Sequence, residues 1–137
     1  MANEATLIYE LSPPIPFTVA DGTGIEKGAS LKLTDPMTAA ASAAANDQIA
    51  GIAATEKIAS DGKTKIGVFR EGIFKVTLSG SCTAGDPAIT DVAANHFKTA
   101  ALTNLSGSVI AGIFLETGTT GETVLMELKP TAQLGSQ

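Results

Sequence analysis

The fragment Gly62-Lys63-Thr64 comes closest to cofactor chemistry in this sequence, because it ends like a loop that binds phosphate. Such a loop requires a glycine five positions before its second glycine, so that successive backbone amides can surround the phosphate oxygens. Position 57 holds lysine instead. The fragment also joins two strand-like runs, whereas a phosphate-binding loop leads into a helix N-terminus. We therefore interpret it as a turn, and Asp21-Gly-Thr-Gly24 as a plain loop, since no strand-to-helix transition follows it.

Nucleophilic and metal chemistry depend on Cys82 and His96, the single cysteine and the single histidine of the chain. One residue of each type is too few for a metal site built from the strong ligands. A cysteine–histidine pair would need the two side chains to meet across the intervening loop and strand. We interpret Cys82 as a small apolar residue at a strand end, and His96 as a residue of a turn or a strand start. A lone cysteine also cannot form an internal disulfide, which is compatible with a reducing compartment.

The acidic residues follow a turn pattern. Several lie next to Gly, Pro, Thr or Asn, where a carboxylate commonly accepts hydrogen bonds from nearby backbone amides. They lack the alternating spacing of a calcium-binding loop. The sequence therefore predicts no catalytic residue, no metal site and no cofactor, and we expect a protein that is not an enzyme. These turn aspartates are Asp35, Asp47, Asp61, Asp86 and Asp91.

Composition favours an all-β domain and argues against nucleic acid and membrane as partners. The chain has 137 residues, 14 of them glycine, and its large apolar side chains are mainly Ile, Leu and Val; this suits strands and tight turns. The net charge of −5, with nine basic residues scattered among fourteen acidic ones, argues against nucleic acid. No apolar run approaches the roughly 20 residues that span a bilayer. The start of the chain lacks a secretory signal pattern, so we expect synthesis in the cytoplasm.

The first 25 residues predict an extended N-terminal arm. Pro13, Pro14 and Pro16 remove backbone donors and fix φ, so this stretch is unsuited to a central strand. An arm that lies across something outside its own domain fits this pattern. An edge strand and a loop of the same domain fit it equally well.

The elements of the first half are expected as follows. A half-buried strand covers 28–35, and the alanine-rich segment Thr38–Ala45 predicts either a short helix or an irregular surface loop. Strands over 48–58 and 64–69 flank Asp61-Gly62, which predicts a type I′ hairpin turn. Glu71-Gly72 predicts a second tight reversal.

Two further strand regions follow. Ile73–Leu78 alternates, with Phe74, Val76 and Leu78 on one face. Strands over 109–115 and 123–128 are expected to form a hairpin, and residues 131–137 a mobile tail.

The sequence contains an internal repeat. Ile49-Ala-Gly-Ile52 recurs as Ile110-Ala-Gly-Ile113, and similar strands precede and follow each copy in the same order. The predicted fold is therefore a single small all-β barrel or sandwich over 26–130, made of two pseudo-repeats at about 28–80 and 85–130, with at most one short helix. Gly51 and Gly112 lie at equivalent places inside strands, which indicates a bulge, a barrel corner or a close backbone approach.

The order and spacing of these motifs resemble the phage capsid decoration, or cement, protein family. The similarity covers roughly residues 28–130. It implies a β-tulip-like fold and a structural protein of the virion, made in the host cytoplasm and bound to the outer capsid surface of a tailed bacteriophage. The motifs are 49–57, 61–66, 71–74, 83–87, 110–116 and 121–125.

The resemblance also implies partners. The major capsid protein is the expected partner, together with two further copies of the chain in a homotrimer on the capsid, and neither nucleic acid nor membrane is expected. The N-terminal segment is the hypothetical capsid contact, through Thr6, Ile8, Tyr9, Leu11, Pro13, Pro14, Ile15 and Phe17. The alternative function is a surface-displayed β binding module of a phage particle, of the fibre or adhesin type. The residues expected to shape structural turns are Gly51, Asp61, Gly62, Glu71, Gly72 and Gly112.

Overall fold

The computed structural model describes residues 4–42, 48–91, 95–100 and 108–133 of the chain. Within these residues every regular element is a β-strand, and no helix is present. The strands are β1 (Thr6–Glu10), β2 (Ile15–Thr18), β3 (Ser30–Asp35), β4 (Thr38–Ala41), β5 (Ile49–Ala53), β6 (Lys65–Phe69), β7 (Gly72–Leu78), β8 (Pro87–Thr90), β9 (His96–Thr99), β10 (Ser108–Phe114) and β11 (Thr123–Gln133).

Strands β2 to β6 form a first closed barrel in the order β2-β4-β3-β5-β6. Neighbouring strands are antiparallel except for β2 and β4, which run parallel and meet at Thr18 and Thr38. The barrel interior is filled by small and branched apolar side chains with few aromatic rings, which suits its narrow bore. Its buried core consists of Phe17, Val19, Ile25, Ala29, Leu31, Ala39, Ala50, Ala53, Ile66 and Val68.

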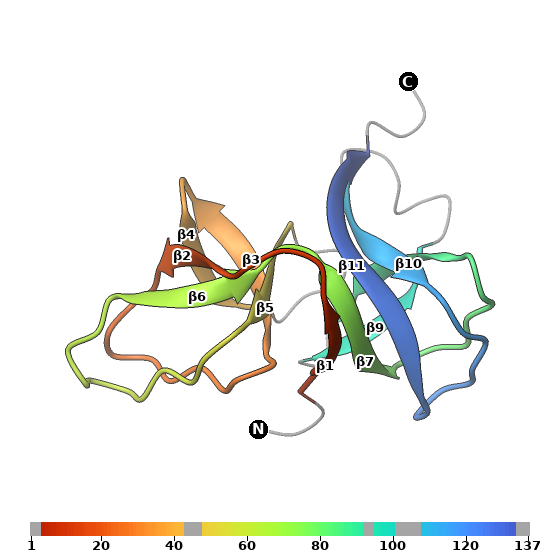
Figure 1. Ribbon diagram of the computed structural model, residues 1–137, viewed down its shortest axis with the longest axis horizontal. Coiled ribbons are helices and arrows are strands. Elements are labelled where there is room, and N and C mark those ends of the chain that lie inside the picture. Colours follow the sequence, from red (N-terminus) through yellow and green to blue (C-terminus); the bar gives the residue numbers. More distant parts are fainter. Residues whose placement is uncertain (1–3, 43–47, 92–94, 101–107, 134–137) are drawn as a thin grey trace.

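Strands β7 to β11 form a second barrel with the same topology. The order β7-β11-β10-β8-β9 is closed by a parallel contact between β7 and β9 at Thr77 and His96. Each strand thus has a counterpart in the first barrel: β7 corresponds to β2, β8 to β3, β9 to β4, β10 to β5 and β11 to β6. The predicted all-β barrel architecture is confirmed, and each pseudo-repeat closes on itself. Figure 1 shows the two barrels side by side, with β1 laid against the second.

The two barrels also share an equivalent pair of backbone hydrogen bonds outside their strands. Ile25 and Lys57 exchange backbone hydrogen bonds in the first barrel, and Cys82 and Gly118 exchange the equivalent pair in the second. Because β2 has the place in its barrel that β7 has in the other, the repeats divide between β6 and β7. The predicted boundaries, about 28–80 and 85–130, are corrected accordingly.

Gly51 and Gly112 have the geometric role that their repetition predicted. Each lies beside a shift in strand register, one between β3 and β5 and the other between β10 and β11. A Cβ on Gly51 would lie 2.1 Å from the carbonyl oxygen of Phe69, and one on Gly112 would lie 1.9 Å from that of Glu127. Both glycines therefore combine a bulge with a close backbone approach.

Two predicted reversals differ from the structure. β5 and β6 do pair, but residues 54–64 connect them, and of Asp61 and Gly62 only the glycine has positive φ, so the turn is not type I′. Glu71-Gly72 does not form a hairpin, because β6 and β7 belong to different barrels. The chain crosses there from the first barrel to the second. The hairpin of β10 and β11 is confirmed.

The prediction of a helix or irregular loop over Thr38–Ala45 is also wrong for its described part. Thr38–Ala41 is strand β4, with Ala39 packed in the first core. Pairing with β3 overrides the helix propensity of alanine in so short a segment. Residues 43–45 lie outside the described residues.

The two ends of the chain belong to the fold more closely than expected. β1 pairs with β7 and β2 pairs with β6, so residues 6–18 are not a separate arm, and the alternative of an edge strand and loop of the same domain is the observed one. At the other end, residues 131–133 continue β11. Residues 134–137 of the predicted tail lie outside the described residues.

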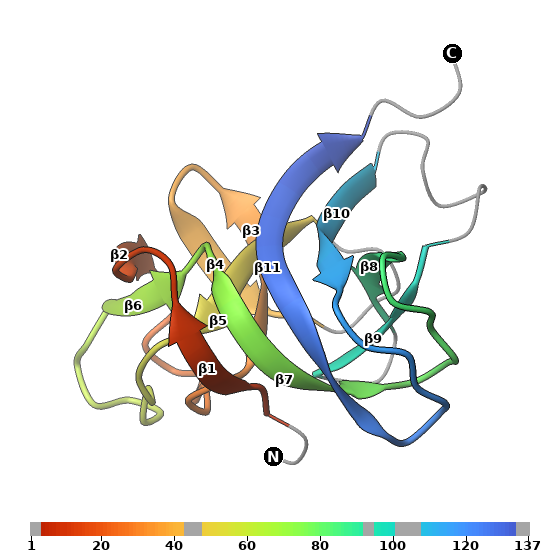
Figure 2. The ribbon, with the colours of Figure 1, turned by 45° about the vertical axis from the view of Figure 1, so that its right-hand side comes forward.

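A shared core joins the barrels. Ile49, Ile52 and Phe69 come from the first barrel but pack in the buried cluster of the second. The rings of Phe69 and Phe74 meet edge to face at 5.7 Å, a favoured aromatic geometry. The alternation predicted for β7 is confirmed, since Phe74, Val76 and Leu78 are all buried in this cluster. Figure 2 shows how β1, β7 and β11 curve across the second barrel.

Candidate functional site

Strand β1 forms the end of its sheet and pairs along one edge, with β7. Its residues Thr6–Glu10 include no proline and no lysine, the residues that commonly protect a sheet edge from further pairing. Its apolar side chains are unusually accessible, with Ile8 42% and Tyr9 64% exposed. The feature is an open backbone edge that can accept another strand.

A groove runs beside β1, between this strand and the first barrel. It encloses about 580 Å³. Phe69, Phe74 and Leu7 contribute apolar surface, and Ala5 donates a backbone hydrogen bond to Gly28 across it. The groove therefore places a mixed lining of apolar and polar residues next to a strand edge. A strand edge and a neighbouring side-chain groove are the two elements that bind an extended peptide. Its full lining is Glu4, Ala5, Thr6, Leu7, Lys27, Gly28, Ala53, Ala54, Phe69 and Phe74.

The equivalent edge of the first barrel is blocked by proline. β1 pairs with β7 through Ile73 and Lys75. Thr18 of β2 corresponds to Thr77 of β7, since each makes the parallel contact that closes its barrel. Counting back from this pair, Pro14 corresponds to Ile73 and Pro16 to Lys75. Thr18 donates its backbone N–H to Met37, so alternate residues before it also face this edge. Prolines at two such positions remove the donors that an added strand would need. The two barrels therefore differ at this edge: the second barrel carries the additional strand β1, and the prolines prevent such pairing on the first.

The eight residues expected to contact the capsid fall into two groups. Phe17 is 2% exposed and belongs to the core of the first barrel, so it is not available to a partner. The other seven are exposed at the surface: Thr6, Ile8, Tyr9, Leu11, Pro13, Pro14 and Ile15. Burial of Phe17 follows from the pairing of β2 with β6, which the proline-rich sequence did not predict.

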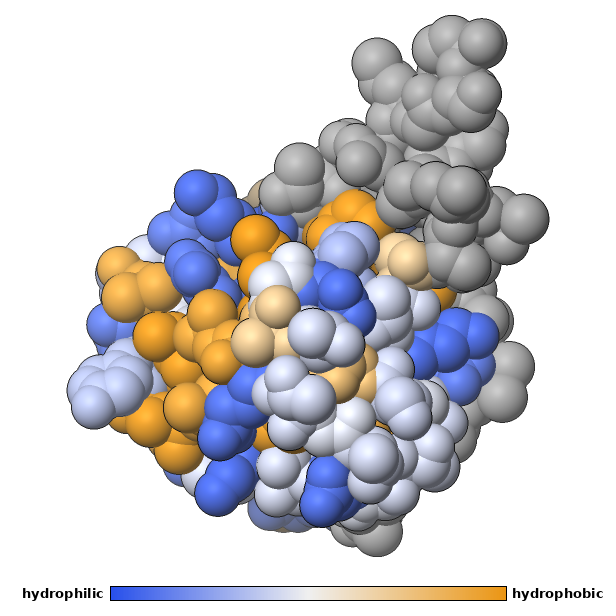
Figure 3. All heavy atoms as spheres, turned by 90° about the vertical axis from the view of Figure 1, so that its right-hand side faces the viewer, coloured by the Kyte–Doolittle hydropathy of each residue, from blue (hydrophilic) through white to orange (hydrophobic). Residues whose placement is uncertain are grey.

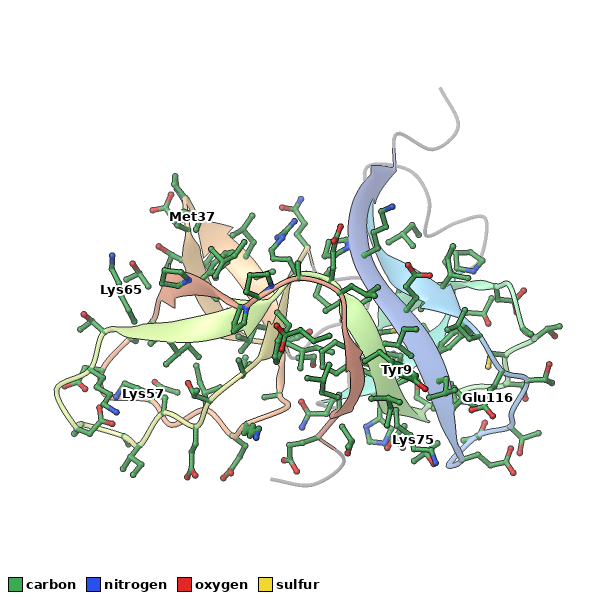
Figure 4. All side chains as sticks on the ribbon, viewed as in Figure 1. Tyr9, Met37, Lys57, Lys65, Lys75 and Glu116 are labelled. Atoms are coloured by element: carbon green, nitrogen blue, oxygen red, sulfur yellow. The ribbon has the colours of Figure 1, made fainter. Side chains whose placement is uncertain are left out.

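A buried lysine connects two loops of the first barrel, the one at residues 21–24 and the one that precedes β6. Lys57 is 1% exposed. Its Nζ donates to Asp21 Oδ1 at 2.9 Å and to Asp61 Oδ1 at 2.7 Å. It also donates to the backbone oxygens of Asp21 and Ile58. The ammonium thus has the acceptors that a buried charge requires, and it ties the 21–24 loop to the turn before β6. Figure 4 labels Lys57 in this loop region.

Ionisation in this cluster favours the charged forms. The hydrogen bond from Lys57, followed by one from the backbone of Gly62, lowers the pKa of Asp21. The same lysine, followed by the backbone of Lys63, lowers the pKa of Asp61. Burial opposes the charge on Lys57, but the hydrogen bonds of Asp61 and Asp21 outweigh it and raise the pKa of the ammonium. The cluster is a structural clamp, because the ammonium of Lys57 is held by two carboxylates that come from different loops.

Sequence reasoning did not assign Lys57 any role. Its equivalent in the second barrel is Gly118, so the repeat itself gave no signal for a buried charge. Asp61 was expected in a turn, and its carboxylate does accept a hydrogen bond from the backbone of Lys63. The pairing with Lys57 and Asp21 arises only when the two loops meet.

Cys82 and His96 have structural positions. Cys82 is buried in the second core, and burial raises the pKa of its thiol. Its Sγ lies 3.3 Å from the backbone oxygen of Glu116. His96 begins β9, as expected for a strand-start residue.

Comparison of the sequence with known proteins identifies no family for this chain. No protein-family model matches the sequence, and no curated protein matches it. Within the described ranges, no group of three or more His, Cys, Asp or Glu side chains is arranged to hold a metal ion. The same part of the chain has no helix that is long and apolar enough to span a membrane.

Proposed function

We propose that this chain is a structural decoration protein, which binds the outer surface of a tailed-phage head and bridges neighbouring major capsid proteins. The observation that supports this function best is the open edge of β1 beside a groove lined by both apolar and polar residues. A strand of the shell protein added to this edge would be held by main-chain hydrogen bonds, and side chains in the groove would select it. The role requires no catalytic group.

The prolines refine the place of contact. Because Pro14 and Pro16 remove donors from the edge of β2, strand addition is directed to β1. Leu11 and Ile15 are 52% and 40% exposed and lie after β1 in the chain. They extend the contact surface through side chains, without a backbone ladder.

Charge supports a place on the outside of the shell. The chain carries a net charge of −5, which repels packaged nucleic acid. The proposed partners are therefore proteins, the major capsid protein and further copies of this chain, with no role for nucleic acid or membrane. The proposed location is the outer capsid surface of the virion, after synthesis in the host cytoplasm.

Repetition on the shell supplies affinity. A homotrimer at a threefold position would use the same edge three times, since cyclic symmetry repeats each contact. Contacts that are weak alone become strong together through effective concentration. Such a trimer would tie several capsid subunits together and resist internal pressure.

The proposal is tested by sedimenting the purified protein with expanded, undecorated heads and with unexpanded procapsids of a phage that encodes it. We expect co-sedimentation with expanded heads. Binding to neither particle would show that the chain is not a decoration protein.

A matched pair of variants tests the β1 edge. Ile8→Lys places on this edge the residue that commonly protects edges, and we expect it to weaken head binding at least tenfold. Ile58→Lys is the control, because Ile58 is 62% exposed and follows Lys57 at the far end of the first barrel. Equal binding by both variants would remove β1 from the interface.

A further inference from the structure

The outer face of the second barrel carries mostly apolar side chains, which lie in two adjacent rows together with one lysine and one glutamate. In the first row, Tyr9 lies opposite Ile73, Ile73 opposite Glu127, Glu127 opposite Ile113, and Ile113 opposite Pro87. In the second row, Lys75 lies opposite Leu125, and Leu115 bonds to the backbone of Leu125. Directly opposed residues project from the same side of a sheet. These eight residues, called here the outer apolar face, are Tyr9, Ile73, Lys75, Pro87, Ile113, Leu115, Leu125 and Glu127.

Solvent reaches this face although four of its eight residues are isoleucine or leucine. Tyr9, Ile113 and Leu115 are 64%, 47% and 40% exposed. Their strand neighbours Phe74 and Phe114 point inward and are buried, so the barrel interior is complete without the outer residues. Figure 3 shows apolar side chains gathered together on this side of the molecule. A large contiguous apolar patch that is surrounded by polar residues commonly marks an interaction surface.

The two charges of the face are opposite and unpaired. Lys75 of β7 and Glu127 of β11 lie two residues apart along adjacent strands. Neither of them forms an ion pair with any other described residue. These eight residues therefore carry no net charge, whereas the chain as a whole carries −5.

We infer that this face binds a second copy of the chain, face to face about a twofold axis. Under such symmetry Lys75 of each copy meets Glu127 of the other, so that two reciprocal ion pairs form. Apolar side chains around them pack as in two stacked sheets. The apolar contacts would supply the affinity, and the ion pairs would set the orientation.

A second copy fits better than another partner because the charge pattern is self-complementary. One positive and one negative group on a neutral face complement their own twofold image, and a neutral face lets two acidic proteins approach. Figure 4 places Tyr9 and Lys75 over the strands of the second barrel, away from the first barrel. This contact needs no phage head, so it is independent of the proposed function. On a shell, it would join two neighbouring trimers.

Charge reversal tests the pairing by sedimentation equilibrium over a wide range of protein concentration. We expect the wild type to dimerise, and Lys75→Glu and Glu127→Lys each to weaken the dimer at least tenfold through repulsion. An equimolar mixture of these two variants is expected to form a heterodimer, since both cross-pairs become attractive again. Lys65→Glu is the control, an exposed lysine on β6 of the first barrel, and should dimerise like the wild type.

The outcomes separate the alternatives. A wild type that stays monomeric at every concentration would overturn the inference. Dimers that survive either single reversal, or a mixture that stays monomeric, would exclude the twofold pairing of Lys75 with Glu127. Thermal unfolding of each variant establishes that it is folded, so that a lost dimer reports on the interface.

Discussion

Replacement of Gly112 by alanine tests the close approach of β10 and β11. The new Cβ would lie 1.9 Å from the carbonyl oxygen of Glu127, about 1 Å inside the 3.0 Å limit for such contacts. It would also lie 3.1 Å from Cα of Leu128. Both neighbours are backbone atoms, so no side-chain rotation can relieve the overlap. The strands must separate, and the ladder between Gly112 and Leu128 must open.

The expected loss follows from the ladder. Two buried backbone hydrogen bonds left without good geometry would cost about 2–4 kcal/mol in total. Alanine restricts the unfolded chain and returns about 0.4–1 kcal/mol. We therefore expect the free energy of unfolding to fall by about 2–3 kcal/mol. For a domain of this size that corresponds to a midpoint lowered by roughly 6–12 °C.

Urea unfolding followed by circular dichroism measures this change, with Gly121→Ala as the control. Gly121 has φ of 89°, and beyond its two chain neighbours nothing lies within 4 Å of the position that a Cβ would take, so alanine there meets only the backbone penalty, about 1–2 kcal/mol. Gly51→Ala should resemble Gly112→Ala, since its Cβ would lie 2.1 Å from a carbonyl oxygen. If Gly112→Ala destabilises the protein less than Gly121→Ala does, the close approach is not the reason for glycine.

Four further outcomes are expected. Stability measured against pH should be fully present above the ordinary aspartate pKa of 3.8 and fall as pH drops through the lowered values of Asp21 and Asp61, and Asp61→Asn should flatten this acid limb. At the alkaline end, the contribution of Lys57 is present below its ordinary pKa of 10.5 and is lost as pH rises through the raised value; Lys57→Met, in calorimetry, should abolish that limb. Ser60→Gly should stabilise the chain by about 0.5–1 kcal/mol in urea unfolding, because Ser60 has φ of 61°; an unchanged midpoint would contradict this. Deletion of residues 1–20 should prevent folding, since it removes β2 and opens the first barrel; a truncated chain with native circular dichroism would show that β2 is dispensable.

Local pattern was sufficient for the features that depend on side-chain alternation and repetition. The inward face of β7 was predicted because strand side chains alternate with a period of two. The repeated glycines pointed to a bulge or a close approach, because the same exception in two copies of a strand reflects shared geometry. The turn role of Asp61 was also predicted, since aspartate bonds to the backbone near it.

Part of the candidate site was predictable in the same way. The exposed apolar residues near the N-terminus, such as Ile8 and Tyr9, were expected at a surface. Phe17 was expected there too, but it is buried. Exposure depends on which strand covers a residue, and a proline-rich sequence does not say that β2 will close a barrel.

By itself the sequence determined that this chain is β-structured and duplicated, because alternation and repetition are properties of residues near one another in the chain. Only the tertiary structure decided that each repeat closes into its own barrel and that the prolines face the edge equivalent to the one that β1 occupies. It also decided that Lys57 would be buried between two carboxylates. These features depend on contacts between residues far apart in the sequence, and whether a charge is paired or an edge is free is set by what the closed fold brings beside it.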